Sequence, residues 1–269
     1  MAGVALDLED KVALITGGSR GIGAETVRLF VEAGARVVFN YRAAREQAGR
    51  LVDACGGAAK CVAVEQELSS PADGRALVAA AVAAFGRLDI LIANHGVWPP
   101  QDVPIAAMGE AQWRRTLAVN LDAVFGLVQG AVAQMERQSA SIKDETVFGQ
   151  SSGHIVLISS TAGQRGEAFH ADYAASKGAL ISLTKGLSTE LAAKGIRVNC
   201  VAPGWVETDM SAGALGDAAV GDRIRAGIPV GRAATPREIA GPVLFLCTPL
   251  AGFISGEVLN VNGGAVLVG

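Results

Sequence analysis

Short apolar runs alternate with longer helical stretches along nearly the whole chain, and this alternation constrains the fold more than any other feature. Runs rich in β-branched residues have the length of strands, and they lie at 11–16, 36–41, 60–65, 88–94, 153–160, 196–203 and 257–261. Repeated strand–helix units favour a parallel sheet with right-handed crossovers and helices on both faces. The sequence therefore predicts an α/β fold: a doubly wound parallel sheet of about seven strands.

Length and composition fit one large domain of this kind. The chain has 269 residues, half of them hydrophobic but only 5% aromatic, so its core must consist mainly of aliphatic side chains. Buried parallel strands covered by helices have this composition. No linker divides the chain, which predicts a single domain over 1–269. A polar, serine-rich stretch at 136–152 is interpreted as a surface insertion, and a role in shaping a partner or substrate surface stays open.

Charge, hydropathy and cysteine spacing exclude several functions. The net charge is -3 without a basic block, so we expect no nucleic-acid partner. Acidic residues precede the first apolar run, unlike a signal peptide, and no apolar run approaches the ~20 residues of a spanning helix. We expect a cytoplasmic protein without a metal site, whose reduced structural thiols are Cys55, Cys61, Cys200 and Cys247.

A glycine-rich turn follows the first predicted strand. Glycines there allow positive φ and close approach of a ligand to the backbone, and the helix that begins near Ile22 presents free N–H groups to a pyrophosphate. Thr16 and Ser19 add hydroxyl donors. The turn is therefore predicted to bind a dinucleotide, through the glycines Gly17, Gly21 and Gly23.

The end of the second predicted strand indicates which dinucleotide. NAD-binding folds place a carboxylate there for the ribose 2′-hydroxyl. This chain has Asn40, Tyr41 and Arg42 instead, and Arg20 lies inside the glycine turn. Two guanidinium groups without a carboxylate favour a 2′-phosphate. We predict NADP(H) as the preferred cofactor, with NAD(H) possible.

Tyr173 and Lys177 lie four residues apart on a predicted helix and so share one helical face. A phenol titrates near ~10 and an ammonium near ~10.4, so neither alone is an obvious catalyst at neutral pH. Such a pair by itself is most typical of a helix surface.

Seven short segments, taken in order, make the chain resemble the short-chain dehydrogenase/reductase family, which has a Rossmann fold. They are "TGGSRGIG", "ANHG", "VNLDAVF", "ISSTAG", "YAASK", "APGWVETDM" and "GEVLNVNGG". Within the family the chain looks most like the 3-oxoacyl-[acyl-carrier-protein] reductase type. The resemblance implies a hydride-transferring oxidoreductase and, as is common in the family, a homotetramer with two long helices, those at 112–135 and 173–193, and the C-terminal segment at its interfaces.

The resemblance also implies the catalytic residues. Tyr173 would be the general acid in reduction and the general base in oxidation, because a nearby ammonium, that of Lys177, is expected to lower the pKa of its phenol. Ser160 would orient the substrate oxygen, and Asn120 would anchor a water in a proton relay. Lys177 would also hold the nicotinamide ribose. The other cofactor contacts implied are Glu67, Leu68, Asn94, Gly96, Pro203, Gly204, Val206 and Thr208.

The chain departs from the family pattern at His95, where alanine is usual. We interpret His95 as a polar substitution beside the cofactor, with a substrate contact as the alternative. A substrate lid is predicted over 207–236, and Trp98, Phe169 and Trp205 are expected to line a partly apolar pocket. Reductases of this type dock an acidic carrier protein through basic residues. Arg137 and Lys194 are weak matches to those residues.

The sequence therefore predicts an NADP(H)-dependent reductase of a ketone or of a 3-oxoacyl thioester, with an acyl carrier protein as a possible partner. An alternative is an alcohol, polyol or steroid dehydrogenase that uses NAD(H). A second alternative is a dinucleotide-binding regulator without turnover. The presence of Asn120, Ser160, Tyr173 and Lys177 together argues against the regulator.

Overall fold

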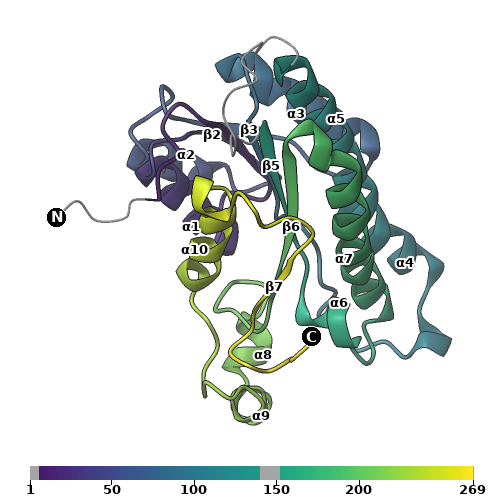
Figure 1. The fold of residues 1–269 in the computed structure, drawn as a ribbon. Helices are drawn as coiled ribbons and strands as arrows, with labels where there is room; N and C mark the ends of the chain where they lie inside the picture. Colours follow the sequence, from purple (N-terminus) through teal and green to yellow (C-terminus); the bar gives the residue numbers. More distant parts are fainter. Residues whose placement is uncertain (1–5, 140–151, 269) are drawn as a thin grey trace.

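A seven-stranded parallel sheet forms the centre of the computed structural model, which describes residues 6–139 and 152–268 (Figure 1). The strand order is β3-β2-β1-β4-β5-β6-β7, and every neighbouring pair runs parallel. The predicted doubly wound fold is confirmed. The strands are β1 (Val12–Ile15), β2 (Arg36–Tyr41), β3 (Cys61–Glu65), β4 (Ile90–Ala93), β5 (Gly153–Ile158), β6 (Ile196–Pro203) and β7 (Val258–Val261).

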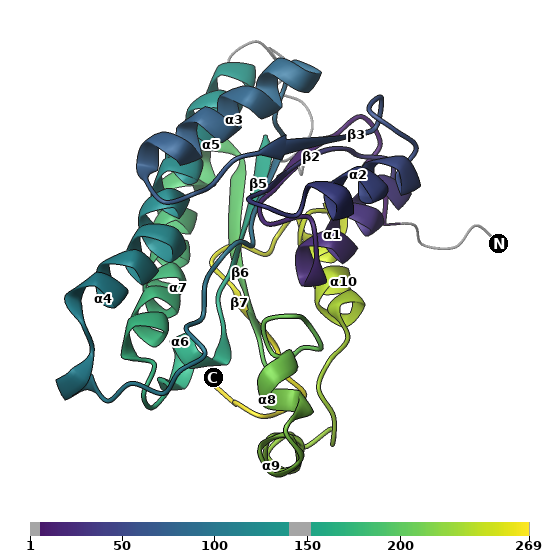
Figure 2. The same ribbon diagram turned by 180° about the vertical axis from the view of Figure 1, so that it is seen from behind.

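Helices cover both faces of the sheet (Figures 1 and 2). One face packs against α1 (Gly21–Glu32), α2 (Arg45–Ala54) and α10 (Pro236–Leu246). The other packs against α3 (Pro71–Phe85), α5 (Ala123–Ser139) and α7 (Ala171–Leu191). The remaining elements are α4 (Glu110–Leu117), α6 (Thr161–Arg165), α8 (Ala212–Gly216) and α9 (Ala218–Ala226), with short 3₁₀ turns at Ile105–Ala107, Ala192–Lys194 and Pro249–Ala251.

Alternation along β1 explains why both faces need cover. Ala13 and Ile15 point into the core under α1 and α10, whereas Leu14 points into the core under α3 and α5. All three side chains are fully buried. A strand with two apolar faces gains burial free energy only when each face is covered, so the sheet lies in the middle of the molecule.

One continuous helix was predicted after β4, but one turn within it is not α-helical. The segment is α4, then a π-helical turn over Ala118–Asp122, then α5. Single π turns occur frequently at functional sites, and this one carries Asn120. The whole Glu110–Ser139 stretch is long and apolar enough to cross a membrane, contrary to the sequence interpretation, but it lies against α3 and α7 as a core helix does.

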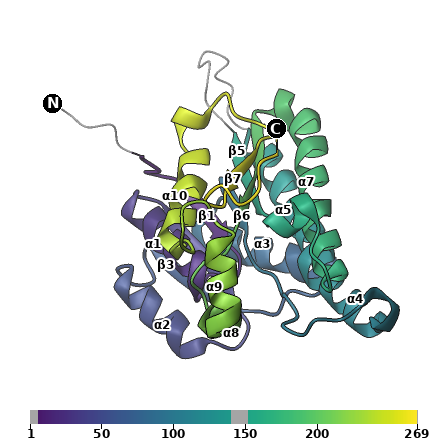
Figure 3. The same ribbon diagram turned by 90° about the horizontal axis from the view of Figure 1, so that it is seen from below.

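Two predicted surface segments differ in how far the structure describes them. Residues 140–151 of the polar insertion lie outside the described residues, while 136–139 form the end of α5. The predicted lid over 207–236 contains α8 and α9, which lie together at the same end of the molecule as α6 (Figures 1 and 3).

The strand order places a crevice at the carboxyl ends of β1 and β4. The chain moves outward from β1 through β2 to β3 and then returns to the other side of β1 with β4. Ligands of open α/β sheets bind where the strand order reverses in this way. The glycine turn after Ile15 and the loop after Ala93 therefore face the same crevice.

Candidate active site

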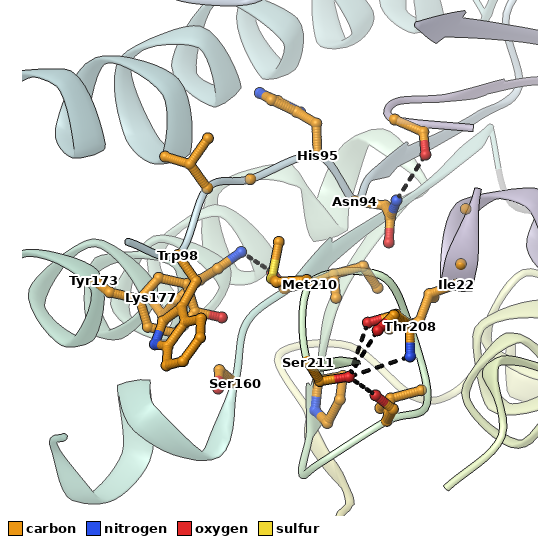
Figure 4. A pocket seen from close by; sticks show the side chains of 18 of the residues that line it. Ile22, Asn94, His95, Trp98, Ser160, Tyr173, Lys177, Thr208, Met210 and Ser211 are labelled. Atoms are coloured by element: carbon orange, nitrogen blue, oxygen red, sulfur yellow. Dashed lines mark hydrogen bonds between the residues drawn. The ribbon is translucent and has the colours of Figure 1, made fainter. Parts of the chain in front are cut away.

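One pocket of about 370 Å³ occupies this crevice, and nearly all the residues predicted from the sequence line it (Figure 4). Figure 4 draws Tyr173, Lys177 and Ser160 at one end and Ile22 and Thr208 at the other. Asn120 lies outside the lining, directly after Val119, which is part of it. The lining includes the predicted residues Gly17, Ser19, Arg20, Gly21, Ile22, Gly23, Asn40, Tyr41, Arg42, Glu67, Leu68, Asn94, Gly96, Ser160, Tyr173, Lys177, Pro203, Gly204, Val206 and Thr208.

The glycine turn has the shape that a dinucleotide pyrophosphate needs. Gly17 has a φ of +64°, and a Cβ added at Gly23 would collide with the carbonyl oxygen of Gly17. The helix that follows, α1, has no side-chain cap at its N-terminus, and its first residues Gly21, Ile22 and Gly23 line the pocket. An uncapped helix N-terminus beside a backbone without side chains fits an anionic ligand.

Replacing Gly23 by alanine should remove dinucleotide binding and destabilise the fold. The added methyl group would also lie 2.8 Å from Asn94 Nδ2, so the turn and the loop after β4 would both have to move. Overpacking of this kind costs about 1–3 kcal/mol. Thermal unfolding and fluorescence titration with NADPH measure the two effects.

Gly49→Ala is the matched control. Gly49 lies inside α2, and a Cβ there would meet no atom within 4 Å. Alanine at such a position stabilises a helix by about 0.5–1 kcal/mol. A Gly23→Ala protein that binds NADPH as tightly as the Gly49→Ala protein would contradict this account of the turn.

The end of the pocket beside the glycine turn holds the two predicted arginines, each beside a carboxylate. Arg20 Nη1 lies 3.4 Å from Asp209 Oδ2, and Arg42 Nη1 lies 3.5 Å from Glu67 Oε1. All four side chains are more than half exposed. Exposed pairs at these distances contribute little free energy, so a phosphate can displace either carboxylate.

Asn40 holds the turn in place through its side chain. The Oδ1 atom accepts a hydrogen bond from Gly17 N at 2.8 Å, and Nδ2 donates to Gln66 O at 2.8 Å. The side chain is nearly fully buried. Asn40, predicted as a cofactor contact, lines the pocket, and its side-chain bonds link the ends of β1, β2 and β3.

Three side chains meet at the reactive end. Ser160 follows β5 and caps α6, and its hydroxyl acts on the Tyr173 phenol as a hydrogen-bonding group that lowers the pKa of the phenol. Lys177 lies one turn further along α7, is 4% exposed and donates from Nζ to Ile158 O at 2.8 Å. Its Nζ lies 5.8 Å from the centre of the Tyr173 ring. The three groups can therefore act on one bound molecule.

The expected lowering of the phenol's pKa is not found. Burial raises the pKa of Tyr173 to about 12, the Ser160 hydrogen bond lowers it, and the charge of Glu167 raises it further. Burial also lowers the pKa of Lys177 to about 8. The ammonium is bonded to a backbone carbonyl and lies beside the ring, so the desolvation of both groups outweighs their attraction.

Asn120 ties three elements together. Its Oδ1 accepts from Val97 N at 2.8 Å, and its Nδ2 donates to Val97 O and to Ser176 Oγ, each at 3.0 Å. Ser176 in turn donates to the carbonyl oxygen of Tyr173 at 2.7 Å. Sequence reasoning missed Ser176, although the serine of "YAASK" carried the signal.

His95 is held between β1 and the π turn. Val119 O can only accept, so Nε2 of His95 carries the proton of their 3.0 Å hydrogen bond, and Nδ1 accepts from the Thr16 hydroxyl at 2.8 Å. Burial and the charge of Lys177 lower the pKa of this imidazole to about 4. Both ring nitrogens are occupied, which favours the interpretation of His95 as a polar substitution over a substrate contact.

Two buried histidines should make the fold less stable as the pH falls. The pKa values of His95 and His154 are both lowered to about 4, chiefly by burial, whereas an unfolded histidine titrates near 6.5. Between these values the unfolded chain binds more protons than the fold, so stability is full above pH 6.5 and decreases below it. Urea unfolding at pH 7 and at pH 5.5 should differ by on the order of 1 kcal/mol per histidine.

A double variant isolates this contribution. His95→Gln and His154→Gln together remove both titrating rings and leave every carboxylate in place. The difference between pH 7 and pH 5.5 should then be largely abolished. An undiminished difference in the double variant would mean that other groups cause the pH dependence.

Aromatic side chains form the substrate end. Trp98 stacks on His170 with ring centres 4.8 Å apart, and it meets Trp205 edge-on at 6.2 Å. Glu167 also lines this end and accepts a hydrogen bond from Trp98 Nε1 at 3.2 Å. Phe169, which was expected in the pocket, is half exposed and does not line it. The segment 164–172 was expected to line the pocket, but Glu167 was not singled out within it.

Known proteins resemble the chain over nearly its whole length. The family model described as enoyl-(acyl carrier protein) reductase matches residues 17–266. The 3-oxoacyl-[acyl-carrier-protein] reductase FabG of Vibrio cholerae is 36% identical over 267 residues, which cover 98% of this chain and 100% of that protein.

Solved structures agree with this match. The 3-ketoacyl-(acyl-carrier-protein) reductase of Brucella melitensis, complexed with NADH, is 31% identical with a TM-score of 0.85 and covers 97% of this chain and 100% of its own. A protein of Agrobacterium tumefaciens with bound NADP is 31% identical with a TM-score of 0.83, over 98% and 99% of the two chains. The chain therefore belongs to the short-chain dehydrogenase/reductase family of NAD(P)-dependent oxidoreductases.

Proposed function

We propose that this enzyme reduces a ketone or a 3-oxoacyl thioester to the alcohol with NADPH, and that Tyr173 donates the proton. One observation carries the proposal. Ser160, Tyr173 and Lys177 lie at one end of a pocket whose other end is an uncapped, glycine-lined helix N-terminus. The bound dinucleotide supplies the hydride.

The protein's part in this reaction is to position the carbonyl and to give it a proton. Ser160 and Tyr173 both present hydroxyl groups, and the oxygen of a carbonyl placed between them accepts from both. The high pKa of the Tyr173 phenol keeps its proton in place at neutral pH, which suits the direction of reduction. As the proton moves to the substrate oxygen, the buried ammonium of Lys177 stabilises the phenolate that forms.

Lys177 and Asn120 are assigned supporting roles. A Cβ added to Gly96 would lie 3.3 Å from Lys177 Nζ, so the ammonium lies beside Gly96 at the border of the pocket. This is the position proposed for the nicotinamide ribose. Asn120 holds the π turn against Val97 and α7. We propose that a water anchored there returns the proton to Lys177.

The preference for NADPH rests on Arg20 and Arg42. Both line the pocket, and neither the turn nor the end of β2 places a carboxylate where a ribose 2′-hydroxyl would bind. Guanidinium groups recognise phosphate through paired hydrogen bonds. Solved relatives that hold NADH and NADP support the general class of cofactor.

A carrier-protein thioester is one candidate substrate, supported by the names of the Vibrio cholerae and Brucella melitensis proteins. The basic residues that would dock the carrier are already engaged. Lys194 pairs with Glu136, and Arg137 donates to Gln134 Oε1 at 2.7 Å. A carrier would have to displace Glu136, so we place a free small-molecule ketone beside the thioester as an equal candidate.

A second function, NAD(H)-dependent oxidation of an alcohol, is favoured by one observation. Glu67 and Asp209 lie within 3.5 Å of the two arginines and offset their positive charge. If these pairs persist when a dinucleotide binds, the site would accept NADH without a 2′-phosphate.

We further propose that the enzyme is a cytoplasmic homotetramer. Apolar side chains are exposed on α5 and near the C-terminus, where relatives of this type would pair, and these are Phe125, Leu250, Phe253 and Leu267. All four cysteines are buried and free, as a reducing compartment permits. Mass photometry at nanomolar concentration tests the oligomeric state.

The function is tested with a panel of ketones, 3-oxoacyl thioesters, sugars and steroids, each assayed with NADPH and NADH at 340 nm. We expect reduction of a ketone or a thioester with at least a several-fold higher kcat/KM for NADPH. A several-fold preference for NADH would overturn the cofactor assignment. Activity confined to alcohol oxidation would support the second function.

A further inference from the structure

Glu167 is a carboxylate inside the substrate end of the pocket that the reduction itself does not use. It lies in the loop between α6 and α7, six residues before Tyr173, and its side chain is only 26% exposed. Its Oε1 accepts from Trp98 Nε1 at 3.2 Å, while none of the described residues hydrogen-bonds Oε2. One oxygen of a half-buried acceptor is therefore free to meet a ligand.

The surroundings hold this carboxylate in place. Trp98 is fixed by its stack on His170, and Nδ1 of His170 lies 3.2 Å from Ala168 O and 3.9 Å from Glu167 Oε1. His170 is 3% exposed, so the stack forms a buried wall behind Glu167. A side chain positioned in this way loses little conformational freedom when a ligand binds, which favours specific recognition.

Glu167 is also close enough to the reacting group to influence it. Its negative charge raises the pKa of the Tyr173 phenol, and burial raises the pKa of Glu167 itself. The other charges that act on Glu167 are those of His170, Arg165 and Asp102. Glu167 and Tyr173 also line the same pocket, so a compact molecule whose carbonyl oxygen meets Tyr173 can place its remaining atoms near Glu167.

We propose that Glu167 selects ketones that carry a hydrogen-bond donor, either a hydroxyl or an ammonium group, a few bonds from the carbonyl carbon. The inference rests on the proposed ketone reduction. The donor would bond Oε2, while the faces and edges of Trp98 and Trp205 contact the carbon skeleton and also favour a cation. A substrate with a carboxylate at that position would meet like charge.

The positive charge of Arg165 competes with Glu167 in determining which substrates bind. Arg165 also lines the pocket, so an anionic substrate has one cation available. Arg165 is exposed, however, whereas Glu167 is half-buried and bonded to Trp98. A charge in a less hydrated position interacts more strongly with a bound ligand, so we assign the selectivity to Glu167.

Four six-membered ketones of similar size test the inference with NADPH. They are cyclohexanone, 4-hydroxycyclohexanone, 1-methylpiperidin-4-one, which is protonated near neutral pH, and 4-oxocyclohexanecarboxylate. We expect the highest kcat/KM for the piperidone or the hydroxyketone and the lowest for the carboxylate. In Glu167→Gln the advantage of the piperidone over cyclohexanone should decrease about tenfold or more, because a charged hydrogen bond is lost. The hydroxyketone should lose less, since an amide oxygen still accepts.

Two further variants separate selectivity from damage to the loop. Asp102→Asn removes a carboxylate 3.9 Å from His170 Nε2 that is 73% exposed and outside the lining, and it should leave the ranking unchanged. Arg165→Gln should lower kcat/KM for the carboxylate ketone alone. Glu167→Gln should also move the alkaline limit of ketone reduction to lower pH, because removal of the negative charge lowers the pKa of the Tyr173 phenol. A structural role of Glu167 would not produce that shift.

The outcomes distinguish this inference from the proposed function. Equal kcat/KM values for the four ketones, or a Glu167→Gln protein with the wild-type ratio, would overturn the inference and leave ketone reduction standing. Turnover of acyl thioesters but of none of the four ketones would overturn it as well. Failure to reduce any ketone or thioester would contradict the proposed function itself.

Discussion

Replacing Tyr173 by phenylalanine should abolish turnover while dinucleotide binding stays nearly unchanged. The variant retains the ring that lies beside Lys177 and removes only the phenol hydroxyl. Loss of a general acid typically costs about 10²–10⁴-fold in rate. Turnover is followed at 340 nm, and binding is followed by the fluorescence of NADPH.

Phe169→Tyr provides the comparison in the loop directly before α7. Its ring is half exposed and does not line the pocket, so an added hydroxyl there should change kcat less than about twofold. Wild-type turnover in Tyr173→Phe would rule out the proposed proton transfer. Loss of NADPH binding together with turnover would mean that the phenol holds the pocket together, and the catalytic assignment would then lose its support.

The fold could be read from the sequence because its determinants are local. Each strand is a short β-branched run, and the helix between two runs requires a parallel crossover, so the number of strands and their direction followed without any long-range information. Both β2 and β6 have the predicted bounds, 36–41 and 196–203. The carboxyl ends of parallel strands meet at one edge, which predicted where the site lies, whereas its catalytic residues were predicted from the resemblance to the short-chain dehydrogenase/reductase family.

Features that depend on partners far apart in the chain were not predicted. The π turn forms where Asn120 bonds the backbone of Val97 and the hydroxyl of Ser176, which lie 23 and 56 residues away. The raised pKa of Tyr173 depends on how deeply the ring is buried, and spacing along a helix does not encode burial. The position of Glu167 beside Trp98 depends on two loops, after β4 and after α6, that meet only in the folded chain.

Replacing Arg20 and Arg42 together by alanine should abolish the proposed preference for NADPH over NADH or reverse it. A charge-assisted hydrogen bond contributes about 1.5–3 kcal/mol, and both arginines are more than half exposed, so we expect about tenfold from each. The kcat/KM for NADPH should fall about 100-fold. The value for NADH should change less than about threefold, because the ribose then offers no phosphate.

The control and the neighbouring carboxylates decide between the two cofactor assignments. Arg45→Ala removes an exposed guanidinium that pairs with Glu65 and does not line the pocket, and it should alter neither value. Glu67→Gln frees Arg42 from its ion pair, so it should raise kcat/KM for NADPH if Arg42 binds the 2′-phosphate. Equal losses of kcat/KM for NADPH and NADH in the double variant would show that the arginines support the pocket without binding the 2′-phosphate. An unchanged preference for NADPH would mean that residues other than Arg20 and Arg42 bind the 2′-phosphate.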